Sequence, residues 1–148
     1  MKLSSFVLIV FVAFLWFGQS PAASHGKSPR DLAMHSLAKH MKVISQSLKG
    51  EAAARKVGYE KSVEIMEISK RMKDLFRMND SSRPNSRASS KIWTENEAFQ
   101  ETIILFSQAA FALSEAFKDG NQKDIETAFR KTGTQCGYCH KRYRLPKK

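Results

Sequence analysis

Apolar residues recur every three or four positions along four segments of the chain, which is the spacing of an amphipathic helix. The second of these segments starts near Glu51 or Lys56 and runs to Met78. No segment shows the strict alternation of a strand, and the links at Gly50 and Gly120 are short. The pattern therefore predicts an all-α fold, an antiparallel four-helix bundle. The other three stripes are Met34, Leu37, Met41, Ile44 and Leu48; Phe99, Ile103, Phe106, Ala110, Leu113 and Phe117; and Ile125, Phe129, Thr132, Cys136, Cys139 or His140, and Tyr143.

Polar residues at the ends of these stripes predict where the helices begin and end. Ser28-Pro29-Arg30-Asp31 has the order of an N-cap, a proline at N1 and an acidic residue at N3. Thr94 and Glu97 have the spacing of a capping box for the third helix. Gly50 is placed to end the first helix, and Asp119-Gly120 to end the third. The last helix then begins at Asn121.

Residues 79–91 interrupt the helical pattern with serines, asparagines, a proline and basic residues. Such a composition predicts an exposed connection, although it is long for a link between two helices. Arg83, Arg87 and Lys91 suit an acidic partner, but a solvated loop is the favoured interpretation of these charges.

The first residues of the chain have the anatomy of a secretory signal peptide. Lys2 precedes an apolar run from Phe6 to Phe17, and small residues follow at Ser20, Ala22, Ala23 and Ser24. A membrane-spanning helix needs about 20 apolar residues, so a permanent anchor is the weaker alternative. We predict a signal peptide at residues 1–23, a mature domain at 24–148 and a periplasmic location.

The chain of 148 residues carries a formal net charge of +11, and the predicted signal peptide contributes only Lys2 to it. Such a field attracts anionic partners. An exported protein rarely meets nucleic acid, so acidic redox proteins or a membrane surface are the partners we expect.

The candidate chemistry lies near the C-terminus, in the run Cys136-Gly137-Tyr138-Cys139-His140. C-x-x-C-H is the spacing of c-type haem attachment. Two thiols three residues apart can add to the two vinyl groups of one porphyrin, and the next imidazole can bind its iron. On a helix, positions i and i+3 share one face, which suits this double anchor. The run predicts one covalent haem with its iron, held by Cys136 and Cys139, with His140 as the proximal ligand.

Other sites use paired cysteines as well, namely redox dithiols, zinc sites and structural disulfides. Zinc needs about four ligands, but the chain has no other cysteine, and His25, His35 and His40 lie far away near the N-terminus. A thioredoxin-like dithiol is expected near a βαβ pattern, which is not visible. Haem attachment is the favoured interpretation.

An exported helical bundle with C-x-x-C-H on its last helix resembles the cytochrome c′ family, the class II c-type cytochromes. Gly133-Thr-Gln-Cys136-Gly-Tyr-Cys139-His140-Lys-Arg-Tyr143-Arg144 is similar to the family's haem motif. Arg30-Asp-Leu-Ala-Met34 resembles its signature on the first helix, and Lys91-Ile92-Trp93 followed by Phe99 resembles the start of the third. Class I cytochromes carry a ligating methionine after the motif, whereas every methionine of this chain precedes it.

The resemblance implies a haem enclosed by the bundle, with His140 on the proximal side. Met34 matches the distal position and is a possible sixth ligand. Arg30 matches a residue near the haem propionates, and Arg144 matches a residue beside the proximal histidine. Core packing for Met34 and solvation for the two arginines are the plain alternatives. Ligation by a second histidine is disfavoured, because His35 and His40 do not share the direction of Met34 on a helix.

The resemblance implies two functions that differ at the sixth coordination position of the iron. Ligation by Met34 gives a six-coordinate haem for electron transfer, which is the function we expect. An open distal side gives a five-coordinate haem that binds nitric oxide or carbon monoxide. An exported non-haem helical dithiol protein is a third alternative. We see no catalytic constellation and expect no enzyme. Members of the family often pair through their first two helices, so a homodimer is one expectation.

Overall fold

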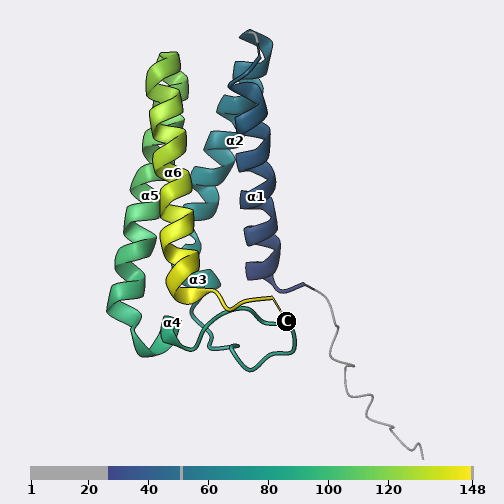
Figure 1. Ribbon diagram of the computed structural model, residues 1–148, viewed down its shortest axis with the longest axis vertical. Coiled ribbons are helices and arrows are strands. Elements are labelled where there is room, and N and C mark those ends of the chain that lie inside the picture. Colours follow the sequence, from purple (N-terminus) through teal and green to yellow (C-terminus); the bar gives the residue numbers. More distant parts are fainter. Residues whose placement is uncertain (1–26, 51, 148) are drawn as a thin grey trace, which may run out of the picture.

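The computed structural model describes residues 27–50 and 52–147. The predicted signal peptide and its cleavage region lie outside these residues. Within them, the chain forms four long helices and two short ones: α1 (Pro29–Ser47), α2 (Ala52–Lys70), α3 (Met72–Leu75), α4 (Lys91–Thr94), α5 (Asn96–Asp119) and α6 (Gln122–Tyr143). The prediction of an all-α four-helix bundle is confirmed, with α3 and α4 as additional single turns (Figure 1).

Side chains at the ends of the helices explain several of their limits. Ser28 is the N-cap of α1, and its hydroxyl accepts from the Asp31 N–H while the Asp31 carboxylate accepts from the Ser28 N–H, so the predicted capping box is present. Asn121 caps α6 in the same way by accepting from the next two backbone N–H groups. Gly120 ends α5 with a φ of 78°, in the left-handed region that glycine adopts without a steric penalty.

Two predicted helix ends are wrong. Residue Thr94 belongs to α4, and α5 begins with Glu95 at its N-cap position and no side-chain cap. The first helix ends at Ser47 with Leu48 as its C-cap, so Gly50 lies in the turn beyond it. The second predicted helix is also divided, because the backbone at Arg71 leaves the helical region between α2 and α3.

The four long helices form a bundle with one open side. Helix α1 packs against α2, α2 against α5, and α5 against α6, whereas α1 and α6 make no comparable contact. In Figure 1, α6 and α1 stand at the front of the bundle and α2 lies behind the space between them. No described helix is long and apolar enough to span a membrane.

The core lies where α2 and α5 meet the other helices. Phe99, Ile65, Leu113, Ile44 and Ile125 are almost completely buried there. The hydroxyl of Thr132 on α6 donates toward the carbonyl oxygens of Ala109 on α5 (3.2 Å) and Ala128 (2.9 Å). This contact fixes α6 against α5, so the face of α6 that carries the cysteines turns toward α1.

Candidate haem site

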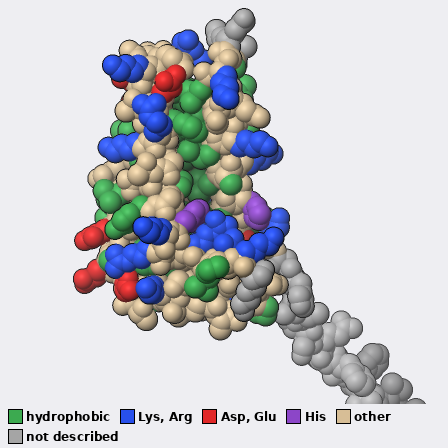
Figure 2. Space-filling view, in the orientation of Figure 1, with side chains coloured by type: hydrophobic (Ala, Val, Ile, Leu, Met, Phe, Trp, Pro, Cys, Tyr) green, Lys and Arg blue, Asp and Glu red, His purple; other side chains and the backbone are tan. Residues whose placement is uncertain are grey.

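An apolar groove runs along the open side of the bundle, between α1 and α6. The space-filling view shows hydrophobic side chains at its floor and basic side chains on both walls (Figure 2). Five partly buried residues of the two walls pack against the core: Met34, Met41, Phe129, Cys136 and Cys139. Partly exposed apolar side chains along one groove offer a surface that a flat apolar group can cover.

The two cysteines belong to the inner face of α6, as the helical spacing predicts. Both thiols are free and partly buried. Burial raises the pKa of both thiols, and a hydrogen bond with the Thr102 hydroxyl opposes the increase at Cys139. Within the described part of the chain, no three side chains of histidine, cysteine, aspartate or glutamate gather as a metal site. The paired thiols in an apolar groove therefore fit a thioether anchor for a porphyrin.

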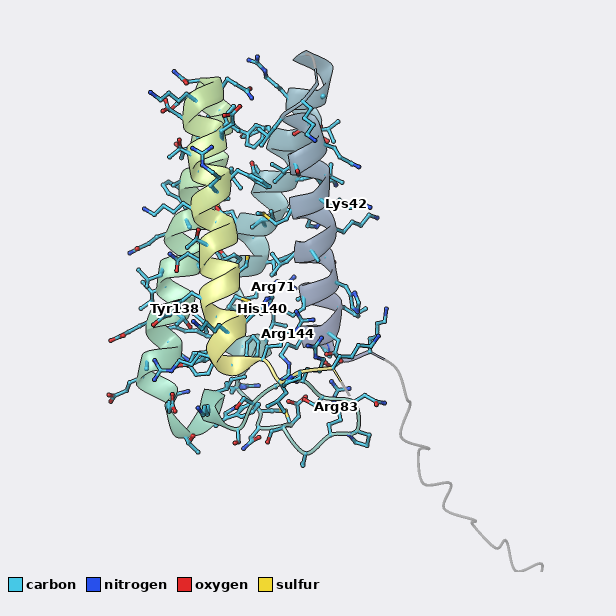
Figure 3. All side chains as sticks on the ribbon, in the orientation of Figure 1. Lys42, Arg71, Arg83, Tyr138, His140 and Arg144 are labelled. Atoms are coloured by element: carbon cyan, nitrogen blue, oxygen red, sulfur yellow. The ribbon has the colours of Figure 1, made fainter. Side chains whose placement is uncertain are left out.

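His140 follows one residue later on α6 and is exposed at the lower end of the groove (Figure 3). Partial burial of the ring, together with the positive charges of Arg144 and Arg87, lowers the pKa of His140. The imidazole is therefore neutral at pH 7, which is the form that binds a metal. Arg144 is the C-cap of α6, four residues after His140, and the two residues lie next to each other in Figure 3, the neighbourhood that the family resemblance implies for Arg144.

Met34 lies at the level of His140 across the groove. The Met41 Cε atom is 3.9 Å from the position that a Cβ of Gly133 would take, so these two residues face each other. Helix α1 runs upward and α6 downward in Figure 1. Seven residues before Met41 is Met34, and seven residues after Gly133 is His140, a displacement of about 10.5 Å along each helix. The antiparallel register therefore brings Met34 and His140 to the same height on opposite walls.

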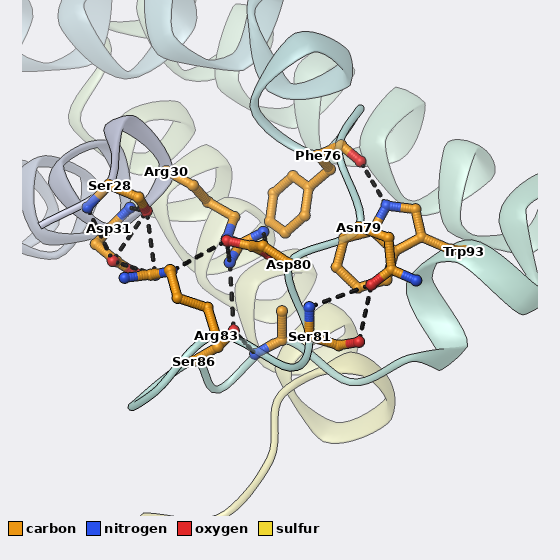
Figure 4. Close-up of polar contacts among 11 residues, drawn as sticks. Ser28, Arg30, Asp31, Phe76, Asn79, Asp80, Ser81, Arg83, Ser86 and Trp93 are labelled. Atoms are coloured by element: carbon orange, nitrogen blue, oxygen red, sulfur yellow. Dashed lines mark hydrogen bonds and ion pairs between the residues drawn. The ribbon is translucent and has the colours of Figure 1, made fainter. Parts of the chain in front are cut away.

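Arg30 is engaged by the long loop between α3 and α4. The residue is only 6% exposed; Nη1 lies 2.6 Å from Asp80 Oδ1, and Nη2 donates to Asp80 Oδ2 at 2.8 Å (Figure 4). Arg83 connects the same Asp80 to Asp31 at the start of α1. The loop is thus tied to α1 by a charge network, and Arg83 is not a freely solvated charge.

A row of aromatic rings lies beneath the lower end of the groove. Tyr143 packs edge-on against Phe99, and Phe99 against Phe76, with 5.0 Å between ring centroids in both pairs. The Arg30 guanidinium lies over the Phe76 ring at 5.1 Å. Edge-to-face pairs of this kind add about 0.5–1.5 kcal/mol to the burial of the rings. The row supports the end of α6 immediately after His140.

The loop also holds the C-terminal end of α6 through its backbone. The Ser89 N–H donates to the Tyr143 carbonyl at 3.0 Å, and the Leu145 N–H donates to the Arg87 carbonyl at 2.8 Å. The Arg87 Nε donates to the Leu145 carbonyl at 2.9 Å. These contacts prevent the last turn of α6, which carries His140, from fraying.

Sequence reasoning missed two members of this site. Met41 lies on the same helix face as Met34. Its spacing of seven residues from Met34 indicates this, but the sequence pattern by itself places Met41 only among the core residues. Asp80 lies in a loop of serines and basic residues, and nothing in the local sequence distinguishes it as the partner of Arg30. The structure gathers the cysteines, His140, Arg144 and Met34 along one groove, and it holds Arg30 at the lower end through Asp80.

Comparisons with known proteins agree with this arrangement. The family model described as Cytochrome C′ matches residues 28–144. The structure of cytochrome c prime from Shewanella frigidimarina is similar, with a TM-score of 0.72, 27% identity, and coverage of 79% of this chain and 91% of that one. Cytochrome c′ from Thermochromatium tepidum gives a TM-score of 0.72 at 21% identity, covering 79% of this chain and 92% of that one.

Two further solved structures share the fold. One is a cytochrome c′ titled for an unusual ligand-controlled dimer dissociation, with a TM-score of 0.72, 22% identity, and coverage of 82% and 99% of the two chains. The other is a ferrous variant of cytochrome c prime from Alcaligenes xylosoxidans with bound nitric oxide, with a TM-score of 0.70, 21% identity, and coverage of 80% and 91%. No curated protein sequence gives a match. Since the family model spans nearly all of the described residues and the groove presents the haem motif, the chain belongs to the cytochrome c′ family, whose members bind covalent haem c with iron.

Proposed function

We propose that the chain carries one haem c in the groove between α1 and α6 and serves as a periplasmic electron carrier rather than an enzyme. Cys136 and Cys139 would hold the porphyrin through thioether bonds, and His140 would bind the iron on the proximal side. When bound, haem supplies a one-electron couple. The residues of this chain supply its attachment, its axial ligands and its surroundings.

The observation that carries this proposal is the contact of Met41 with Gly133 across the groove, from which the antiparallel register puts Met34 at the height of His140. A thioether is a soft ligand that stabilises reduced iron, so a His/Met pair raises the reduction potential, as in other electron-carrying cytochromes. Met34 is only partly buried, and its unbranched side chain can reach into the groove without rearranging the core.

The positive charge on the groove face supports electron transfer to an acidic protein. Basic side chains stand on both walls of the groove in Figure 2, and acidic ones are few on this face. Such a field steers an acidic partner toward the groove at low ionic strength. The rate of electron exchange with an acidic redox protein is therefore expected to fall as salt is added, because salt screens exposed charges over about 10 Å at 0.1 M. A rate independent of salt would contradict the steering.

Gas binding is the second candidate function, and related solved structures favour it. The Alcaligenes xylosoxidans protein is described with bound nitric oxide, and another relative shows ligand-controlled dissociation of its dimer. The wall formed by Met34 and Met41 is apolar, which suits a small uncharged gas.

An absorption spectrum of the reduced protein, with and without carbon monoxide, separates the two functions. Electron transfer through a methionine-ligated haem predicts a low-spin ferrous spectrum that carbon monoxide changes little. A high-spin ferrous spectrum that shifts as soon as carbon monoxide is added would contradict methionine ligation and favour gas binding as the function.

A further inference from the structure

Arg71 is an arginine near the groove whose guanidinium is not engaged by another described side chain. It lies at the break between α2 and α3, is exposed, and makes no side-chain hydrogen bond or ion pair with any residue that the structure describes. In Figure 3 it occupies the lower part of the space between α6 and α1, behind His140 and Arg144. A cation in this space is positioned for an anionic group of whatever fills the groove.

Arg30, which the family resemblance assigns to the haem propionates, is already paired with a carboxylate of the protein. Both terminal nitrogens of Arg30 contact Asp80, at 2.6 and 2.8 Å, and Nη2 also lies 3.4 Å from the Ser86 hydroxyl. Its ring contact with Phe76 restricts it further. Release of Arg30 would leave the Asp80 carboxylate with Arg83 alone, whose Nε is 3.3 Å away. Breaking such a partly buried charge pair is costly.

Two other arginines at this end of the bundle, Arg144 and Arg87, lie near His140. Arg144 lies beside His140 and follows it by one helical turn, and the Nε of Arg87 donates to the Leu145 carbonyl. Both belong to the α6 end of the groove. Arg71 comes from the α2–α3 junction, on a different element from the cysteines. A porphyrin carries its two carboxylates at the edge opposite its vinyl groups, and therefore away from the thioethers.

We propose that Arg71 is the residue that neutralises a haem propionate in this chain, in place of Arg30. A guanidinium pairs with a carboxylate through two parallel N–H···O bonds, a geometry that lysine does not match. The inference rests on covalent haem in the groove and is independent of whether the protein carries electrons or gas.

The test is the reduction potential of purified holoprotein carrying Arg71→Gln, with Arg77→Gln as the matched control. Arg77 is also exposed and has no side-chain partner within the described residues, but it lies in the turn after α3. Loss of a cation beside a propionate disfavours the reduced haem, so Arg71→Gln should lower the midpoint potential. The pH-dependent step of the potential should also move to higher pH, because the propionate loses its stabilising charge. Arg71→Lys should restore part of both changes.

Haem content by mass and helical content by circular dichroism show that the variants remain folded and loaded. Equal potentials and equal pH profiles for Arg71→Gln and Arg77→Gln would overturn the proposal while leaving the proposed electron transfer intact. A purified chain without covalent haem would overturn the proposal and the proposed function together.

Discussion

Arg30 on α1 and Asp80 in the loop before α4 form a charge pair that joins two parts of the chain fifty residues apart. Nη1 of Arg30 and Oδ1 of Asp80 are separated by 2.6 Å, and the arginine is almost completely buried. The pair fixes the long loop against the start of α1. The same loop holds the end of α6 through Ser89 and Arg87. One segment without helical structure therefore connects both walls of the haem groove.

Removal of the Asp80 charge should destabilise the fold. Asp80→Asn leaves a buried guanidinium without its counter-charge, and a group left unsatisfied in this way costs about 1–3 kcal/mol. The free energy of unfolding, measured by urea titration, should fall by this amount. Asp74→Asn removes a carboxylate from α3 that is exposed and has no ion-pair partner among the described residues, and it should leave stability unchanged. Equal effects of the two substitutions would show that the Arg30 pair is not required.

Met34→Ala tests the assignment of the sixth ligand. If the thioether of Met34 binds iron, its removal should convert a low-spin ferrous spectrum into a high-spin one and allow carbon monoxide to bind. Met41→Ala is the control, because Met41 lies two turns higher on the same face, opposite Gly133. It should leave the spin state unchanged. A Met34→Ala spectrum identical to that of the wild type would remove Met34 from the iron.

Gly58→Ala should destabilise the bundle by about 1–3 kcal/mol, the usual cost of overpacking a well-filled site. A Cβ at Gly58 would collide with the Ser47 hydroxyl and the Phe117 ring, where α1, α2 and α5 meet. Gly137→Ala makes the same chemical change on α6, where nothing lies within 4 Å of the added carbon. Its free energy of unfolding should stay the same or rise slightly, because alanine is the better helix former. A stable Gly58→Ala variant would mean that the three helices are less closely packed there.

Stability should depend on His40 as the pH is lowered. Burial lowers the pKa of His40, and the Glu64 carboxylate, 3.0 Å from Nε2, only partly opposes this effect. Nδ1 is buried and has no partner, so the folded protein favours the neutral ring. The unfolded chain binds the proton more readily, near its ordinary pKa of 6.5. The free energy of unfolding should therefore decrease as the pH falls below about 6.5.

His40→Gln should reduce this slope between pH 7 and pH 5, and His35→Gln, at an exposed site on the same helix, should retain it. The lowered pKa of Glu64 acts in a separate range, because its contribution is lost only as the pH falls below about 4.5. An unchanged slope in His40→Gln would assign the acid sensitivity to another group.

Local features of the fold were predictable from sequence because local chemistry determines them. The capping box at Ser28, the end of α5 at Gly120 and the start of the last helix at Asn121 depend on groups within one turn, and all three predictions agree with the structure. Thr94 has the right spacing for a cap, but the single turn of α4 takes it into a helix of its own.

The relative positions of residues on different helices were harder to predict from the sequence. The height of Met34 relative to His140 depends on the register of two antiparallel helices that hardly touch each other. The capture of Arg30 by Asp80 depends on the path of a loop whose composition indicates only exposure. The cysteines were identifiable because the chemistry of thioether formation fixes their spacing, whereas the groove that receives the porphyrin is a product of tertiary packing.

The central claim is that a porphyrin is bound covalently through Cys136 and Cys139. The most direct measurement is the intact mass of the mature protein, produced in a host with cytochrome c maturation machinery and denatured before analysis. The account predicts a mass equal to the polypeptide plus one haem, which becomes the bare polypeptide mass when both cysteines are replaced by alanine. A wild-type protein with the mass of the bare polypeptide would contradict it.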